Sequence, residues 1–383
     1  MKQIKFGKPL IGQQEKDAVL AVLQGDTLVH GPRAKTFEAQ FAAYTGAPHA
    51  VSVSSCTAAL HLCYFYLGIG PGDEVIVPAQ THTATAHAVE FTGARPVFVD
   101  AEKNTGNIDI EQIEENISDR TRALSVVHFL GMPVDMDRVL NIAKKYDLFV
   151  VEDCALSIGA TFKGTHSGLL GDAGCFSFYP VKHMTTAEGG MLITKLGQLA
   201  KKVVRQKAFG VDRTVSERKV PGVYDVDMLG FNYRMSELHA AIGLEQIRRM
   251  DDFLRARKEN YARLTAGLEQ IEEISLFQSS HAEFESSHYC HAVLLNGSLA
   301  GNRFEIVTAL KDAGVGTSVY YPRAVPHLTY YREKHGYTDS SFPVAAWISD
   351  SSIALPVGPH LSPEDMDYVV DSLKKAILKV KSS

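Results

Sequence analysis

The segment Leu148-Phe149-Val150-Val151-Glu152-Asp153 decides the fold class of this chain. Its four apolar residues predict a short strand that is buried on both faces, and two acidic residues end it. Similar apolar runs occur at residues 50–53, 74–77, 96–99, 124–127, 175–178 and 191–194. Segments with helical spacing, such as 57–68 and 134–146, separate most of these runs. Strands that alternate with helices indicate an α/β fold around a large, mostly parallel sheet of seven strands, with functional residues at the carboxyl ends of the strands.

The pattern changes after this region. Residues 236–271 form one long helical stretch with many charges and an apolar stripe, which we interpret as a connector. Strand-like residues 291–295 and helix-like residues 303–313 follow it. We therefore expect a large α/β domain over residues 1–250, which includes an N-terminal arm, and a small C-terminal α+β domain over residues 251–383. Because no repeat or low-complexity linker separates them, we expect the two domains to pack tightly.

Composition and charge argue against several classes of protein. The chain of 383 residues has a net charge of -5, which gives no electrostatic reason to expect nucleic acid or an anionic membrane as a partner. Its N-terminus lacks the apolar core of a secretory leader, and no uninterrupted apolar run reaches about 18 residues, so we expect a soluble, cytoplasmic protein. The five cysteines are odd in number and lack a C-x-x-C pair, which favours neither a disulfide framework nor a metal site.

The two acids that end the first quoted strand require different surroundings. Because side chains alternate along a strand, Glu152 and Asp153 are expected to point to opposite faces of the sheet. A buried carboxylate is costly unless a cation or several donors compensate it, so we expect a positive group near Asp153. The alternative is that Asp153 only caps the following helix.

A second candidate segment joins a strand to a helix. Val53-Ser54-Ser55-Cys56-Thr57-Ala58-Ala59-Leu60 places small hydroxyl residues at a predicted helix start. Free amide groups and the helix dipole favour an anion such as a phosphate there. An ordinary helix cap by Ser55 or Thr57 explains the same residues.

The third segment places a lysine between two predicted strands. Lys182 follows an apolar and aromatic run that includes Phe176 and Phe178. Partial burial would lower the pKa of its amine and make it a nucleophile suited to Schiff-base chemistry. Ser177 could supply a further phosphate ligand. The alternative is an ordinary surface lysine.

Seven segments, taken together and in this order, resemble the DegT/DnrJ/EryC1/StrS family of sugar aminotransferases, which use pyridoxal 5'-phosphate (PLP). The resemblance covers nearly the whole chain, and it implies the aspartate-aminotransferase fold, PLP fold type I. The segments are residues 29–32, 55–62, 72–78, 152–153, 176–182, 188–190 and 230–236.

The resemblance implies roles for individual residues. Lys182 would carry PLP as a Schiff base and later move a proton, and Asp153 would pair with the pyridine nitrogen. Cys56, Thr57 and Ser177 would hold the phosphate. His82 stands where the family usually stacks an aromatic residue on the cofactor ring. Asn232 would reach the phosphate of a neighbouring subunit, which implies a homodimer with shared active sites.

Two positions test this reading against the family pattern. The family commonly has Gln or His near the cofactor hydroxyl, where this chain has Leu156, so Ser157 or a water would have to replace that contact. A relative in which histidine replaces the lysine is a sugar 3-dehydratase. Because Lys182 keeps the lysine place and His183 follows it, the register favours transamination, with His183 as a neighbouring structural or cofactor-contacting group.

Three further residues are candidate substrate contacts. Tyr320 and His327 lie in a segment that resembles one facing the active site in the family, although they could equally be aromatic residues of a domain interface. Arg234 could bind a carboxylate or phosphate with two hydrogen bonds, or form a structural salt bridge.

The sequence therefore predicts a PLP-dependent aminotransferase that moves an amino group from an amino acid, expected to be L-glutamate, to a keto-sugar. The resemblance favours a nucleotide-linked acceptor of the NDP-4-keto-6-deoxy-sugar type. Two alternatives stay open: a transaminase of another carbonyl compound, such as a keto-inositol or a sugar without a nucleotide, and a non-catalytic PLP-binding regulatory protein.

Overall fold

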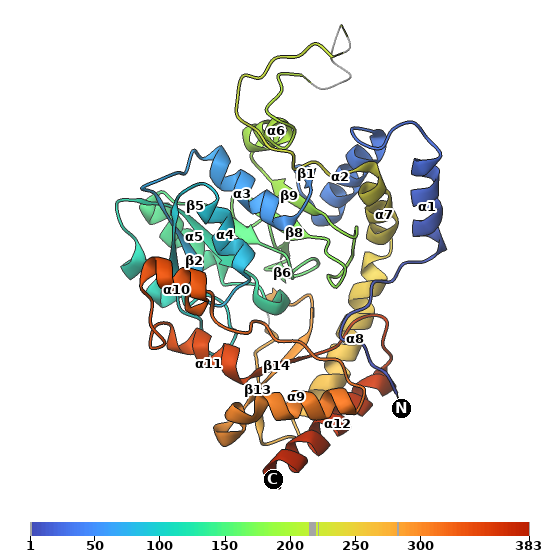
Figure 1. Cartoon of the computed structure of the whole chain (residues 1–383), viewed down its shortest axis with the longest axis vertical. Helices are drawn as coiled ribbons and strands as arrows, with labels where there is room; N and C mark the ends of the chain where they lie inside the picture. The colour runs from blue at the N-terminus through green and yellow to red at the C-terminus, as the bar shows by residue number, and fades with distance from the viewer. Residues whose placement is uncertain (1, 214–219, 221, 282, 383) are drawn as a thin grey trace.

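A seven-stranded sheet forms the centre of the molecule (Figure 1). The computed structural model describes residues 2–213, 220, 222–281 and 283–382. The strand order is β1-β9-β8-β5-β4-β2-β3; β9 is antiparallel to both its neighbours and the other pairs are parallel. The strands are β1 His49–Val53, β2 Glu74–Pro78, β3 Arg95–Val99, β4 Thr121–Val127, β5 Phe149–Asp153, β8 Ala173–Ser177 and β9 Gly190–Thr194. All seven predicted strands are confirmed, because each apolar run fills a position that is covered on both faces.

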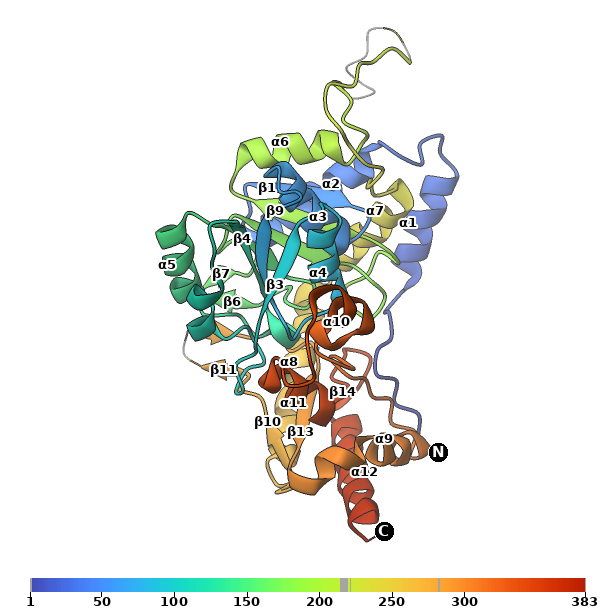
Figure 2. The same ribbon diagram turned by 60° about the vertical axis from the view of Figure 1, so that its left-hand side comes forward.

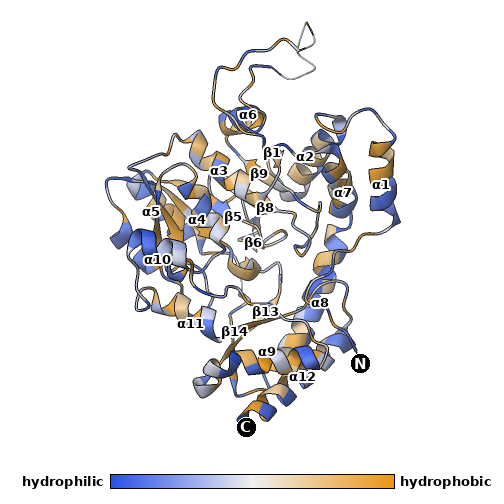
Figure 3. Cartoon of the chain, viewed as in Figure 1, coloured by the Kyte–Doolittle hydropathy of each residue, from blue (hydrophilic) through white to orange (hydrophobic). Residues whose placement is uncertain are grey.

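Helices cover both faces of this sheet (Figure 2). On one face, the apolar core joins strand residues to α3 Cys56–Tyr66, α4 Thr83–Glu90 and α6 Gly197–Gln206. On the other face, the core joins them to α2 Pro32–Thr45, α5 Met136–Tyr146 and α7 Glu237–Ile247. Figure 3 shows apolar residues concentrated in the strands between these helices. The predicted α/β class, with a large, mostly parallel sheet of seven strands, is confirmed.

A second, smaller part of the chain follows. Its three-stranded antiparallel sheet has the order β10-β13-β14, with β10 Ile274–Leu276, β13 His291–Leu295 and β14 Ser352–Leu355. Its helices are α9 Arg303–Asp312, α10 Thr329–His335, α11 Pro343–Ser351 and α12 Pro363–Lys381. The predicted domain boundary after residue 250 stays a prediction. The N-terminal arm pairs with this smaller part, where Ile4 forms a bridge with Val315.

A third small sheet lies between the two parts of the chain. It joins the hairpin β6 Thr161–Phe162 and β7 Thr165–His166 to the hairpin β11 Ser280–His281 and β12 Phe284–Glu285. Antiparallel pairing of β6 with β12 therefore connects residues that are more than a hundred positions apart.

The helical stretch predicted over residues 236–271 is wrong in one respect, because the structure divides it into α7 and α8 Met250–Leu268. The break lies at Arg249, which has non-helical dihedral angles. Its side chain donates to Glu15 Oε1 at 2.5 Å and to the Leu10 carbonyl at 2.6 Å. The chain turns here because α7 packs against α1 Gln13–Leu23 and α2, whereas α8 packs along α12.

Among the described residues, none of the helices combines the length and the apolar character that a membrane crossing requires.

Candidate active site

The predicted residues at the strand ends meet along one edge of the large sheet. Val53, at the end of β1, pairs with Gly190, and Gly190 pairs with Ser177 at the end of β8. Asp153 ends β5, which lies beside β8. The segment that follows β2 leads into α4 at the same edge, because β2 runs parallel to β5 through β4. The fold thus gathers side chains from four segments that are distant in sequence.

Asp153 is buried on the face covered by α3 and α4. Its Oδ2 accepts a hydrogen bond from Thr85 Oγ1 at 2.8 Å, and its Oδ1 accepts one from the Ala155 amide at 3.0 Å. The Cys56 thiol lies 3.8 Å from Oδ1. The alternative that Asp153 only caps a following helix is wrong, because β5 is followed by a turn and then by β6; the contact with Ala155 belongs to this turn. It accounts for one oxygen only, so Asp153 has further capacity to accept hydrogen bonds.

Glu152 points to the opposite face, as the strand period predicts. It is fully buried and accepts hydrogen bonds from the amides of Gly168, Leu170 and Gly171 at 2.6 to 2.9 Å. His128 Nε2 lies 2.9 Å from its carboxylate. These contacts give both carboxylate oxygens of Glu152 hydrogen-bond partners, and they hold residues 168–171 against β5. Glu152 is therefore a structural group.

His128, Glu152 and Cys154 also offer three potential metal-ligand atoms within 4.8 Å of one another. The other ring nitrogen of His128, Nδ1, accepts a hydrogen bond from the Val134 amide at 3.1 Å. Both imidazole nitrogens and both carboxylate oxygens therefore have partners within the protein, and hydrogen bonding explains this cluster without an ion.

Lys182 lies in the connection between β8 and β9, with its side chain half-buried. Its Nζ is 5.4 Å from the centroid of the Tyr289 ring, and no hydrogen bond or ion pair of this amine is found among the described residues. Burial lowers the pKa of the Lys182 amine, and the nearby carboxylate of Asp153 partly offsets that effect. Lys182 is thus the cation expected near Asp153, and its amine is available for reaction.

The start of α3 and the end of β8 form the two sides of a possible anion site. Ser55 caps α3, since its hydroxyl accepts a hydrogen bond from the Ala58 amide at 3.1 Å. The Cys56 thiol is buried and lies 3.3 Å from the Cys175 carbonyl, so only its backbone can bind a ligand phosphate. A side chain at Gly190 would lie 2.6 Å from the Cys56 amide nitrogen. Glycine is therefore required for β9 to approach the helix start so closely.

His82 stands at the rim of this region. Its Nδ1 accepts a hydrogen bond from the Ala84 amide at 3.1 Å, which caps α4. Its ring contacts the ring of Tyr321 edge-on, with centroids 5.7 Å apart. Burial, and then the positive charge of Lys182, lower the pKa of the His82 imidazole. The neutral ring can present a face to an aromatic ligand.

The smaller part of the chain contributes the side chains of Tyr289 and Tyr320 to this region. The hydroxyl of Tyr320 lies 2.9 Å from that of Tyr289, whose ring contacts Lys182. The carbonyl of Tyr289 accepts a hydrogen bond from Arg257, a buried residue of α8, at 2.7 Å. Tyr320 is thereby connected to Lys182 through Tyr289, and its predicted role as a substrate contact stays a prediction.

Sequence reasoning missed Thr85, Tyr289, Cys290 and Tyr321, all of which face Lys182 or Asp153. A signal existed for Thr85, which belongs to a run of hydroxyl residues directly after a buried strand. The sequence around Tyr289 and Cys290 carries no comparable pattern, because only the fold brings these residues over Lys182.

Other candidates lie in different surroundings. His327 Nε2 lies 2.6 Å from the Ser341 carbonyl, and the Ser157 hydroxyl lies 3.0 Å from that of Ser167. No described contact joins either side chain to Lys182 or Asp153. Their predicted roles in binding stay untested, and these contacts favour a structural role.

Arg234 and Asn232 lie in the connection before α7. The guanidinium of Arg234 packs over the Phe209 ring at 4.8 Å, its Nε is buried without a hydrogen-bond partner, and it forms no ion pair within the described parts of the chain. The structural salt bridge that was considered for Arg234 is therefore not found. The side chain of Asn232 is exposed.

His183 is a core residue. It is 3 % exposed, and its Nε2 lies 3.1 Å from the Ser287 carbonyl. Burial, and then the charge of Arg257, hold the pKa of this imidazole well below its usual range. These contacts agree with the structural role predicted for His183.

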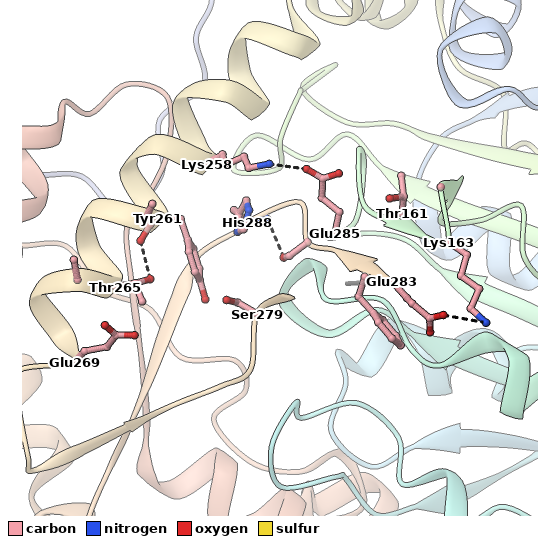
Figure 4. Close-up of a pocket in the computed structure, with 15 residues that line it drawn as sticks. Thr161, Lys163, Lys258, Tyr261, Thr265, Glu269, Ser279, Glu283, Glu285 and His288 are labelled. Carbon is pink, nitrogen blue, oxygen red and sulfur yellow. Dashed lines mark hydrogen bonds and ion pairs between the residues drawn. The ribbon is translucent and has the colours of Figure 1, made fainter. Parts of the chain in front are cut away.

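A groove of about 870 Å³ lies outside this region, between α8 and the small sheet of β6 and β12 (Figure 4). Lys258 pairs with Glu285 at 2.8 Å, and Lys163 lies 3.5 Å from Glu283. Its lining contains none of the predicted site residues. We therefore place the candidate active site at Lys182 and Asp153 and not in this groove.

Comparisons with known proteins confirm the predicted PLP fold type I architecture. The model of the DegT/DnrJ/EryC1/StrS aminotransferase family matches residues 9–374. The spore coat polysaccharide biosynthesis protein SpsC of Bacillus subtilis (strain 168) is 37% identical over 379 residues, which cover 98% of this chain and 97% of that protein. These matches span both parts of the chain.

Solved structures are similar over the same length. The PLP form of the putative sugar aminotransferase Spr1654 from Streptococcus pneumoniae has a TM-score of 0.92 and 30% identity, covering 99% of this chain and 100% of that one. DesV from S. venezuelae, solved with a ketimine intermediate, has a TM-score of 0.87 and 32% identity, covering 95% of this chain and 94% of that one.

Proposed function

The chain belongs to the DegT/DnrJ/EryC1/StrS aminotransferase family and is a PLP-dependent aminotransferase, and from this premise we propose its substrates and the roles of its residues. We propose that it transfers the amino group of L-glutamate to a nucleotide-linked 4-keto-6-deoxy-sugar. Spr1654 is described as a putative sugar aminotransferase and SpsC as a spore coat polysaccharide biosynthesis protein, which supports a sugar acceptor. We further propose that it acts in the cytoplasm, in keeping with its five unpaired, buried cysteines.

The residues present fit PLP. The amine of Lys182 has no hydrogen bond within the described structure and would hold the cofactor covalently. Asp153 would accept a hydrogen bond from the ring nitrogen, and His82 would cover the ring. Ser177 and the start of α3, at Cys56 and Thr57, would hold the phosphate, because unpaired amides and hydroxyls at a helix start favour an anion.

The observation that carries this proposal is the proximity of Lys182 and Asp153 at one edge of the sheet, with a helix start that could bind an anion next to them. The bound cofactor supplies an electron sink for the bonds that break at the amine-bearing carbon. Lys182, once released by the donor, would move the proton at that carbon, because burial lowers the pKa of its amine and so favours the neutral form that can accept a proton. Asp153 would keep the ring nitrogen protonated, and the Tyr289 ring would limit the positions open to the lysine.

Two half-reactions test the assignment. Glutamate added to the holoenzyme is expected to bleach the visible absorbance of bound PLP, and a keto-sugar nucleotide added next is expected to restore it. A panel of keto-sugar nucleotides, keto-sugars without a nucleotide and keto-inositols separates the acceptors. Restoration only by a keto-inositol or a free sugar would overturn the nucleotide-linked acceptor. The absence of bleaching with any amino acid would contradict glutamate as donor and favour a regulatory PLP-binding protein.

We also propose that the enzyme is a homodimer in which each active site uses Asn232 of the partner. The described parts of the connection between α6 and α7 project from the body of the molecule (Figure 1). They expose large apolar side chains at Phe209, Tyr224 and Leu229. An apolar groove of about 490 Å³ runs along α1 and includes Pro180 and Ala187 of the Lys182 connection. Exposed apolar surface next to an active site favours burial against a second copy.

Complementation tests the shared site. Asn232→Ala is expected to be inactive at limiting PLP, because the partner's phosphate would lose a ligand. Co-expression of this variant with Lys182→Ala is expected to restore about a quarter of the wild-type activity, because half of the dimers are mixed and each has one intact site. Two different affinity tags isolate the mixed dimers. A mixture that stays inactive, or a monomer in ultracentrifugation at micromolar concentration, would exclude the shared site.

A further inference from the structure

A row of buried hydroxyl groups ends at Asp153. Thr85 Oγ1 lies 2.8 Å from Asp153 Oδ2 and 2.8 Å from Thr81 Oγ1. Thr81 is 1 % exposed, Thr85 is 0 % exposed and Asp153 is 4 % exposed, so water does not compete for these contacts. Hydrogen bonds in such surroundings fix side chains firmly, and the loss of one leaves a buried group without a partner.

The direction of hydrogen-bond donation along this row is defined. An ionised carboxylate only accepts hydrogen bonds, so Thr85 donates its single proton to Asp153. Thr85 therefore has no proton left for Thr81, and Thr81 must donate to Thr85. The row is thus Thr81 to Thr85 to Asp153, and each hydrogen bond in it helps to fix the position of the carboxylate.

The second oxygen of Asp153 is held from a different direction. The Ala155 amide donates to Oδ1 at 3.0 Å, whereas Thr85 donates to Oδ2. Oδ1 also lies 3.8 Å from the Cys56 thiol. Contacts on both oxygens fix the plane of the carboxylate. Oδ2 keeps one further acceptor position, and no described ion pair with Lys182 occupies it.

We propose that Thr85, supported by Thr81, is a positioning residue that holds the Asp153 carboxylate in place and directed at the ring nitrogen of PLP. This inference rests on the proposed pairing of Asp153 with that nitrogen. Thr85 lies in the first turn of α4, three residues after the cap residue His82. The start of α4 therefore positions both the Asp153 carboxylate and the His82 ring that would cover the cofactor.

Thr85→Val removes the hydroxyl and keeps the shape of the side chain, whereas Thr85→Ser keeps the hydroxyl. We expect Thr85→Val to weaken PLP binding about tenfold, because hydrogen bonds to charged groups have effects of this size, and Thr85→Ser to bind within about twofold of wild type. The ratio of the absorbance bands of bound PLP at fixed pH is expected to change in Thr85→Val and to be restored in Thr85→Ser. Thr81→Val is expected to weaken PLP binding as well, by about two- to threefold.

Thr45→Val is the matched control. Thr45 is also buried, but its hydroxyl donates only to carbonyls of its own helix, so this variant is expected to change thermal stability and not PLP binding. If Thr85→Val does not fold, Thr81→Val and Thr85→Ser carry the test. Wild-type PLP binding and absorbance in Thr81→Val would then overturn the positioning role of the hydroxyl row. A large effect of Asp153→Asn with none in Thr85→Val would reject this positioning role but not the pairing of Asp153 with PLP. An Asp153→Asn variant that resembles wild type would reject the pairing itself.

Discussion

Lys182→Ala is expected to lower the rate of amino transfer from glutamate by at least about 10³-fold, because it removes both the attachment of PLP and the proton-transferring amine. Overall folding is expected to be preserved, since Lys182 makes no hydrogen bond through its amine within the described structure. PLP is expected to bind more weakly and without a covalent link. Borohydride reduction followed by peptide mass spectrometry should find the cofactor on Lys182 in wild type and on no residue in the variant.

Lys202→Ala is the matched control for this experiment. The amine of Lys202 also lies over a tyrosine ring, at 5.2 Å from the centroid of Tyr66, but in α6 and outside the candidate site. Its removal is expected to leave both turnover and the mass-spectrometric result unchanged. Full turnover by Lys182→Ala, or a borohydride adduct on another lysine, would show that the catalytic lysine is a different one.

The strands and the residues that directly follow them could be predicted from the sequence, for a physical reason. A strand buried on both faces needs an uninterrupted apolar run, and the polar residues that end β5 and β8 then reach the same edge of the sheet. The position of Asp153 follows from the period of two within β5. The candidate role of Lys182 was predictable because a lysine between two strands rarely has such apolar neighbours in the sequence.

The contacts between distant segments could not be predicted in this way. Tyr289 reaches Lys182 only because the small part of the chain folds back on the large sheet, and no local pattern encodes that contact. His327 lies in a segment that resembles one facing the active site in the family, but its ring lies against the Ser341 carbonyl. The break at Arg249 was missed because it depends on Glu15 in α1, not on helix propensity.

Asp153→Asn has the second largest expected effect. An amide can donate to the ring nitrogen but cannot stabilise its protonated form, so PLP would lose its capacity as an electron sink. We expect kcat with glutamate to fall by about 10²- to 10³-fold, as when one electrostatic group of an active site is removed. The absorbance bands of bound PLP are expected to shift as well, which reports on the ring directly and independently of turnover.

Asp100→Asn separates this role from the loss of a buried acid in general. Asp100 directly follows β3, an edge strand of the same sheet, is 4 % exposed like Asp153, and accepts hydrogen bonds from the amides of Val344 and Ala345. Its substitution is expected to lower the melting temperature while leaving the absorbance of PLP unchanged. Equal changes in both variants would mean that Asp153 acts through stability alone. A change in absorbance confined to Asp153→Asn would instead require contact with the cofactor ring, because the two acids match in burial and in their position at the sheet edge.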